Sequence, residues 1–159
     1  MKTHIVVAYA TKHGSTLEVA EAIAASLRDE GHDVDVVAAA DVRKLDDYSA
    51  VVLGGALYVG RWHHDAIGFL KRHRRSLAAR PLAVFAMGPA PATEEALAES
   101  RGQLDRALAR VPELEPAAVA IFGGVVDPSK LRFPFKHMPA SDARDWDAIR
   151  AWAAAVAPT

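Results

Sequence analysis

The residues best suited to chemistry form a hydroxyl-rich turn between an apolar run and an amphipathic helix. The turn, Thr11-Lys12-His13-Gly14-Ser15-Thr16, follows apolar residues 5–9 and leads into residues 17–23. A strand, a turn and a helix in this order aim backbone N–H groups and the positive end of the helix dipole at one point. The three hydroxyls can donate hydrogen bonds to phosphate oxygens, and Gly14 lets the backbone approach closely. The turn therefore predicts a phosphate site, with an ordinary N-capped helix as the alternative.

The spacing of the turn differs from the two common nucleotide motifs. A Walker loop requires G-x-x-x-x-G-K-[ST], and a dinucleotide fingerprint requires G-x-G-x-x-G after the strand. Neither pattern occurs here, and Lys12 adds a cation to an otherwise uncharged set of donors. The turn instead resembles the phosphate loop of flavodoxins, and this resemblance implies a monophosphate held by hydroxyls and amides.

Two further loops follow apolar runs, and their positions resemble those of the flavodoxin loops that hold a flat ring. The first contains Ala56, Leu57, Tyr58, Val59, Gly60 and Trp62, and the second contains Met87, Gly88 and Pro89. Tyr58 or Trp62 could supply an aromatic wall for a planar ligand, although either could instead pack under the helix that follows. The second loop carries no aromatic residue, so its side of the pocket is expected to be aliphatic or open.

Regular elements must bring these loops together. Five apolar, β-branched runs predict strands at about 3–9, 34–38, 50–55, 81–87 and 117–125. Helical apolar spacing lies between them, at residues 17–27, 67–77, 97–111 and 146–156, and the last helix is expected to start at Ser141 or Asp142. Strands that are apolar throughout and alternate with helices imply a parallel sheet covered on both faces.

This pattern predicts a single α/β domain over residues 1–159, a three-layer sandwich with strand order 2-1-3-4-5. In such sheets the ligand lies beyond the carboxyl ends of the strands, beside strand 1. All three loops follow strands 1, 3 and 4 and would meet there. A receiver domain shares the fold but needs acidic residues where this chain has Tyr9-Ala10 and Gly54-Gly55, so a receiver domain is not expected.

The chain resembles the flavodoxin superfamily over nearly its whole length. Within it, residues 9–16, 57–63 and 142–146 are most similar to flavodoxin-domain proteins related to menaquinone-dependent protoporphyrinogen oxidase. The resemblance implies FMN as cofactor, with its phosphate on residues 11–16 and its ring between loops 55–62 and 87–93. It also implies a quinone-linked dehydrogenation. The oxidase carries a longer insertion where this chain has the short stretch 127–139, whose aromatic and basic residues could touch a quinone, a porphyrin carboxylate or a membrane surface, or fold back over the sheet.

Composition excludes several classes of function. The chain has 159 residues, no cysteine and a net charge of -1. Disulfides, cysteine-ligated iron–sulfur clusters and strong electrostatic binding to nucleic acid are therefore excluded. The surface lacks the acidic surplus of carrier flavodoxins. A strand begins almost at residue 1 and no apolar run reaches the length of a membrane span, so we expect a cytoplasmic protein with at most peripheral membrane contact.

Two groups of charged or ligating residues do not belong to the three loops. The run 71–75, extended by Arg80, is either a solvated helix face or a docking surface for an acidic partner or anionic lipid. His63 and His64 are adjacent, which on a helix points them about 100° apart, so no metal site is expected.

Three functions remain open on the sequence. The first is an FMN-dependent oxidoreductase that acts on a small molecule or quinone, or on a redox protein. The second is a non-enzymatic electron carrier of the flavodoxin type. The third is a binding module of the same fold that lacks FMN or takes a deazaflavin.

Overall fold

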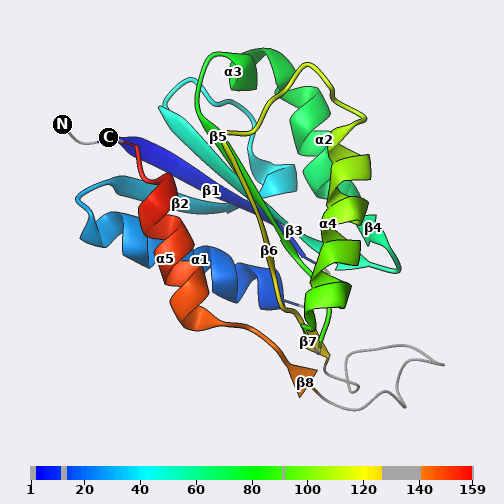
Figure 1. Cartoon of the computed structure of the whole chain (residues 1–159). Helices are drawn as coiled ribbons and strands as arrows, with labels where there is room; N and C mark the ends of the chain where they lie inside the picture. The colour runs from blue at the N-terminus through cyan, green and yellow to red at the C-terminus, as the bar shows by residue number, and fades with distance from the viewer. Residues whose placement is uncertain (1–2, 12–13, 91, 127–140, 159) are drawn as a thin grey trace.

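The computed structural model describes residues 3–11, 14–90, 92–126 and 141–158. Its main sheet contains five parallel strands in the order β2-β1-β3-β5-β6 (Figure 1). Their bounds are β1 His4–Ala10, β2 Asp33–Ala38, β3 Ala50–Tyr58, β5 Leu82–Met87 and β6 Ala118–Phe122. Because β4 is a short strand paired only to β3, this order is the predicted 2-1-3-4-5. The predicted fold class is confirmed.

Helices cover both faces of the sheet (Figure 1). One face carries α1 (Ser15–Asp29) and α5 (Trp146–Val156), and the other carries α2 (His64–Arg72) and α4 (Glu94–Leu108). Alternate residues of β1 enter two separate cores, since Val6 packs in the α2/α4 cluster and Val7 in the α1/α5 cluster. A strand buried on both faces has no polar side, which is why these runs are apolar throughout.

Several short elements were not predicted from the sequence. Strand β4 (Arg61–Trp62) turns back on the end of β3, and the 3-10 helix η1 (Ala39–Asp41) follows β2. Strands β7 (Val125–Val126) and β8 (Ser141–Asp142) form a separate antiparallel pair. Two-residue strands have too few residues to show a periodic pattern.

The helix predicted over residues 67–77 is divided in two. It breaks at His73 (φ -105°, ψ 14°), and α3 (Arg74–Ala78) follows. The His73 side chain is buried, and its Nε2 lies 3.1 Å from the carbonyl oxygen of Val42. Arg72 donates to the carbonyl of Ala39 at 2.9 Å. The junction between α2 and α3 is thus held by contacts with the segment after β2, about thirty residues away along the chain.

The expected start of the last helix at Ser141 or Asp142 was wrong. α5 begins at Trp146, and the Asp145 carboxylate caps it by accepting a hydrogen bond from the Ala148 N–H at 3.0 Å. Ser141 and Asp142 instead pair with β7. Asp145 and Asp142 are both good N-cap residues by type, and strand pairing decided between them.

Candidate functional site

The three predicted loops leave the sheet at neighbouring points. The strand register places Ala10 beside Gly55 and Ala56 beside Met87. These are the last or nearly last residues of β1, β3 and β5, so the segments that follow them begin at the same edge of the sheet. The carboxyl edge is therefore the candidate site, as expected for a doubly wound sheet.

The turn after β1 presents the start of α1 without a side-chain cap. Its N-cap residue is Gly14, in the left-handed conformation with φ 89°, which glycine adopts without steric cost. The Gly14 N–H donates to Thr11 Oγ1 at 2.9 Å. Among the described residues no side chain caps the first turn of α1. Ser15 is half-buried, and Lys12 and His13 lie outside the described residues.

Thr16, in the first turn of α1, supplies the test of whether this turn fits a phosphate. Its side chain is fully buried, and its Oγ1 has no hydrogen-bond partner among the described residues. A buried hydroxyl left without a partner costs about 1–3 kcal/mol. A donor of this kind beside an uncapped helix N-terminus fits a bound oxyanion, which would accept its hydrogen bond.

The loop after β3 is a tight hairpin. Tyr58 pairs with Arg61 across a two-residue turn made by Val59 (φ 50°) and Gly60 (φ 75°). Positive φ at both positions is the pattern of a type I′ turn, and it is uncommon for a β-branched residue. The Val59 side chain is 73% exposed, whereas Ala56, Leu57 and Tyr58 are half-buried. The hairpin tip is thus an exposed apolar residue on a strained backbone.

Trp62 packs in the core instead of lining the edge. It is 2% exposed, and its Nε1 donates to the carbonyl of Gly55 at 3.0 Å. A Cβ added to Gly55 would lie 2.6 Å from Trp62 Nε1 and 3.0 Å from Ala66 Cβ, so the glycine makes room for the indole. Packing under the following helix was the alternative left open for both aromatic residues. Tyr58 is therefore the remaining candidate for an aromatic wall.

The loop after β5 is joined to the loop after β6. The Gly88 N–H donates to the Phe122 carbonyl at 2.6 Å, and the Gly124 N–H donates to the Pro89 carbonyl at 2.9 Å. A Cβ on Gly124 would lie 2.3 Å from the Gly88 carbonyl oxygen, so this approach requires glycine. Met87 is 2% exposed and belongs to the α1/α5 core. Gly88 and Pro89 are half-buried and remain at the edge.

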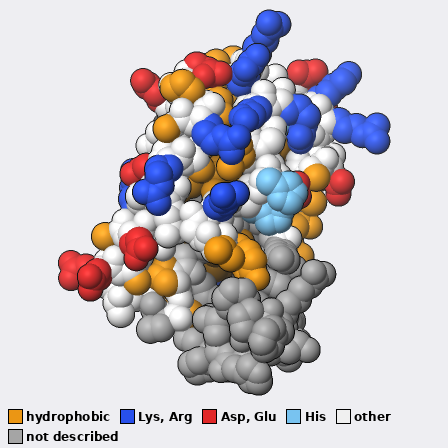
Figure 2. Space-filling view, turned by 90° about the vertical axis from the view of Figure 1, so that its right-hand side faces the viewer, with side chains coloured by type: hydrophobic (Ala, Val, Ile, Leu, Met, Phe, Trp, Pro, Cys, Tyr) orange, Lys and Arg blue, Asp and Glu red, His pale blue; other side chains and the backbone are white. Residues whose placement is uncertain are grey.

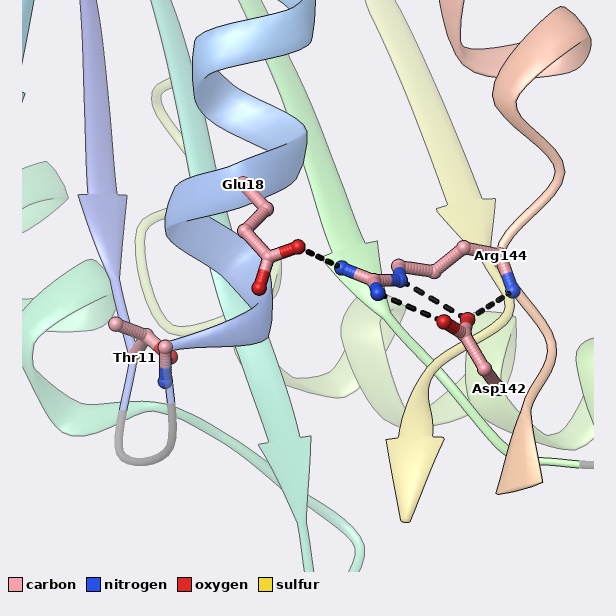
Figure 3. A network of polar contacts seen from close by, with 5 residues as sticks. Thr11, Glu18, Asp142 and Arg144 are labelled. Atoms are coloured by element: carbon pink, nitrogen blue, oxygen red, sulfur yellow. Dashed lines mark hydrogen bonds and ion pairs between the residues drawn. The ribbon is translucent and has the colours of Figure 1, made fainter. Parts of the chain in front are cut away.

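Arg144 joins the start of α1 to the strand β8, a contact whose role was not predicted (Figure 3). Its Nη2 and Nε donate to the two Asp142 carboxylate oxygens at 2.7 and 3.0 Å, and Nη1 donates to Glu18 Oε2 at 2.9 Å. Its guanidinium carbon lies 4.8 Å from the Trp146 ring centroid. Residues 142–146 were among the motifs that carried the resemblance, which was the available signal for this contact.

The Arg144 network shifts the pKa values of Asp142 and Arg144. The hydrogen bond from the Arg144 guanidinium lowers the pKa of Asp142 below its usual value, against the opposing effect of burial. The hydrogen bond to Asp142, helped by Glu18, raises the pKa of Arg144. Both groups are therefore charged at neutral pH, and the cluster has one cation between two carboxylates.

Three potential metal ligands lie close together after the β3–β4 hairpin. His63, His64 and Asp65 bring one potential ligand atom each within 4.8 Å of one another, closer than their sequence spacing suggested. The His63 Nδ1 already accepts a hydrogen bond from the Asp65 N–H, so this nitrogen caps α2.

Figure 2 shows Lys and Arg side chains gathered on the upper half of the α2/α4 side of the molecule.

The basic run 71–80 is partly structural. Residues 66–93 contain no Asp or Glu. Arg80 donates to the Ser76 carbonyl at 2.7 Å, as Arg72 does to Ala39, so these two side chains brace the backbone. The α3 part of the run lies at the opposite end of the sheet from β7 and β8 (Figure 1). No described helix is long and apolar enough to cross a membrane.

Comparison with known proteins agrees with this geometry. The family model described as Flavodoxin domain matches residues 6–139. Protoporphyrinogen IX dehydrogenase [quinone] of Escherichia coli K12 is 26% identical in an alignment 139 residues long, and the match covers 84% of this chain and 71% of the relative.

Solved structures show the same fold at low identity. Oxidised flavodoxin 1 from Bacillus cereus superimposes with a TM-score of 0.64 at 16% identity, over 97% of both chains. Flavodoxin 2 from the same organism gives 0.63 at 21%, over 96% of this chain and 97% of that one. Rubredoxin oxygen:oxidoreductase from Desulfovibrio gigas gives 0.62 at 17%, over 96% of this chain but 35% of that one. Fold, loop positions and the match over residues 6–139 together show that the chain belongs to the flavodoxin-domain family.

Proposed function

We propose that this protein binds FMN non-covalently at the carboxyl edge of its sheet and uses it as a redox cofactor. The observation that carries the proposal is the buried Thr16 hydroxyl, which has no partner among the described residues and lies at the uncapped start of α1. A phosphate there would accept a hydrogen bond from this hydroxyl and from the free N–H groups of the first turn. Thr11, Ser15, Lys12 and His13 complete the proposed phosphate site.

The ring of the cofactor is proposed to lie between the β3–β4 hairpin and the loop after β5. Tyr58, half-buried at the end of β3, is the aromatic residue proposed to stack on the ring, and Val59 and Gly60 form the exposed tip beside it. Ala56 and Leu57 lead into this tip, and Gly88 and Pro89 would border the other side. Trp62 and Met87 would act indirectly, because each is buried beneath its loop.

The proposed reaction is a quinone-linked dehydrogenation. Bound FMN would supply the hydride or electron transfer, and the chain would bind the phosphate, orient the ring and limit the access of water. The support for a quinone is the 26% identical relative, whose name specifies protoporphyrinogen IX and quinone. We propose a small molecule or quinone as the redox partner, with the protein acting in the cytoplasm.

The first test is the visible absorption spectrum of the freshly purified protein, with the heat-released cofactor identified by mass. A yellow protein that releases FMN supports the proposal and leads to assays with quinones and porphyrinogens. A colourless protein that also fails to bind added FMN contradicts the proposal. A released deazaflavin would keep the site and change the cofactor.

A non-enzymatic electron carrier is the second candidate function. It is favoured by the structural similarity to two Bacillus cereus flavodoxins over nearly the full length of both chains. A carrier should accept electrons singly, with two well-separated potentials in a redox titration, and should not oxidise porphyrinogens with a quinone as acceptor. Rapid quinone reduction during turnover would favour the enzyme.

A further inference from the structure

The Arg144 network lies against the same helix turn that would hold the phosphate. Glu18 is the acidic residue of the first turn of α1, and its backbone N–H donates to the Gly14 carbonyl at 3.4 Å. A carboxylate in this turn would normally compete with a bound anion for the positive end of the helix dipole. Figure 3 shows the Glu18 side chain directed away from Thr11 and toward Arg144.

Resting on the proposed function, we propose that Arg144 is a positioning residue that sets the preference of the site for a phosphorylated flavin. It does so by holding the Glu18 and Asp142 carboxylates as its counter-ions. With Arg144 present, the cluster beside the helix start carries a net charge of one negative unit. Without it, two carboxylates with no cation between them would remain near the start of α1, where a phosphate carrying up to two negative charges is proposed to bind.

Arg144 is built into the fold firmly enough to act in this way. Its side chain is 10% exposed, whereas the side chains of Glu18 and Asp142 are 63% and 50% exposed. Asp142 Oδ1 also accepts the Arg144 backbone N–H at 3.1 Å. The neighbouring Ala143 N–H donates to the Gly124 carbonyl at 2.9 Å. The guanidinium is therefore presented from an anchored backbone, and two exposed acids are drawn to a nearly buried cation.

A comparison of FMN with riboflavin distinguishes an electrostatic role of Arg144 from a merely structural one. A structural brace would support the whole cofactor site, so its loss would weaken FMN and riboflavin alike. An electrostatic role acts on the phosphate, which riboflavin lacks. It should also weaken as salt rises, because charges on a partly exposed surface are screened beyond about 3 Å at about 1 M salt.

The experiment measures dissociation constants for FMN and riboflavin with wild type, Arg144→Met and Arg144→Lys at low and high salt. We expect Arg144→Met to bind FMN about tenfold more weakly at low salt, as estimated for unit charges several ångströms apart near a surface. Riboflavin affinity should stay unchanged, and the FMN defect should largely disappear at high salt. Arg144→Lys keeps the charge and should retain most of the FMN affinity.

Two further variants complete the test. Adding Glu18→Gln to Arg144→Met removes one of the exposed negative charges and should restore part of the lost FMN affinity. Arg150→Met is the matched control, because Arg150 also pairs with an aspartate, Asp147, at 2.6 Å but does so on α5. This control should leave both flavin affinities unchanged.

Either of two results would overturn the inference: an equal loss of FMN and riboflavin in Arg144→Met, or no loss of FMN at low salt. A wild-type protein that binds neither flavin would contradict the proposed function itself, and the inference would fall with it. If wild type binds FMN but Arg144→Met gives either of these two results, the inference alone is contradicted.

Discussion

Two helices begin at the same edge of the sheet, α1 and α4, and their N-termini differ in capping. The Thr93 hydroxyl caps α4 by accepting the Ala96 N–H at 3.1 Å, and Glu94 and Glu95 lie in its first turn. α1 begins at Gly14 without a side-chain cap, and the Thr16 hydroxyl beside it is buried. α4 thus has a side-chain cap and two acids in its first turn, whereas the described residues give α1 no side-chain cap and pair its first-turn acid, Glu18, with Arg144.

The contrast supports the proposal that the start of α1, and not that of α4, binds the phosphate. An N-cap contributes about 1 kcal/mol to stability, and a buried hydroxyl without a partner costs a similar amount or more. A chain that caps α2, α4 and α5 with His63, Thr93 and Asp145 has the residue types needed to cap α1 as well. Leaving α1 open is explained if an anion completes it.

The same substitution at the two helices should have the largest and most unequal effect. Thr16→Asp places a negative charge in the buried position beside the proposed phosphate, and we expect FMN binding to be lost, by more than about a hundredfold. Thr93→Asp exchanges one good N-cap residue for another and should change FMN affinity far less. Fluorescence titration with FMN measures both.

Unchanged FMN affinity in Thr16→Asp would show that the turn at residues 11–16 does not hold the phosphate. A loss in Thr93→Asp as large as in Thr16→Asp would remove the distinction between the two helices. Folding of each variant is checked by circular dichroism before titration.

Removing the hydroxyl alone should separate stability from binding. Thr16→Val keeps the shape of the side chain and should make the cofactor-free protein more stable by about 1 kcal/mol, since a buried group without a partner is lost. The same variant should bind FMN about tenfold more weakly, because a hydrogen bond to a charged group is worth about 1.5–3 kcal/mol. Urea unfolding of the cofactor-free protein and FMN titration give the two values.

The control at α4 should show the reverse. Thr93→Ala removes a cap in use and should cost about 1 kcal/mol of stability, with a smaller change in FMN affinity than in Thr16→Val. If Thr16→Val instead destabilises the cofactor-free protein as Thr93→Ala does, the Thr16 hydroxyl has a partner within the chain and α1 is not open.

The smallest expected effect concerns the ion pair between Arg144 and Asp142, beside the start of α1. The pKa of Asp142 is lowered by Arg144, so this interaction stabilises the folded protein above the unfolded pKa of about 3.9. The stabilisation is lost as the pH falls through the lower folded pKa. Arg144→Met should therefore cost less than about 1 kcal/mol at pH 7, since Asp142 is half exposed, and the difference from wild type should shrink below about pH 4.

Urea unfolding at several pH values measures this difference. A difference between wild type and Arg144→Met that persists unchanged to pH 3 would mean that packing of Arg144 on Trp146, not its charge, provides the stability.

Much of the fold and part of the site could be predicted because their signals are local. The five parallel strands follow from short runs of apolar, β-branched residues, and their order follows from the general rules of doubly wound sheets. The phosphate turn is a contiguous stretch, so its residue types were visible together. The division of the helix at His73 was not visible, because it depends on a contact with Val42, 31 residues away.

Side-chain partners over long distances were decided by the tertiary structure. Tyr58 and Trp62 are both aromatic residues of one loop, and only the packing of the indole against Gly55 separates the buried one from the half-exposed one. Arg144 and Glu18 are 126 positions apart, so no local pattern could pair them.

The sequence by itself determined the α/β architecture. It also predicts the edge where a ligand would bind and the turn that would hold a phosphate, since each of these depends on residues close along the chain. Which hydroxyl is left without a partner and which arginine neutralises the acid beside it depend on how distant segments pack. Hydrogen bonds and ion pairs act over a few ångströms, and only the folded chain sets which groups come within that range.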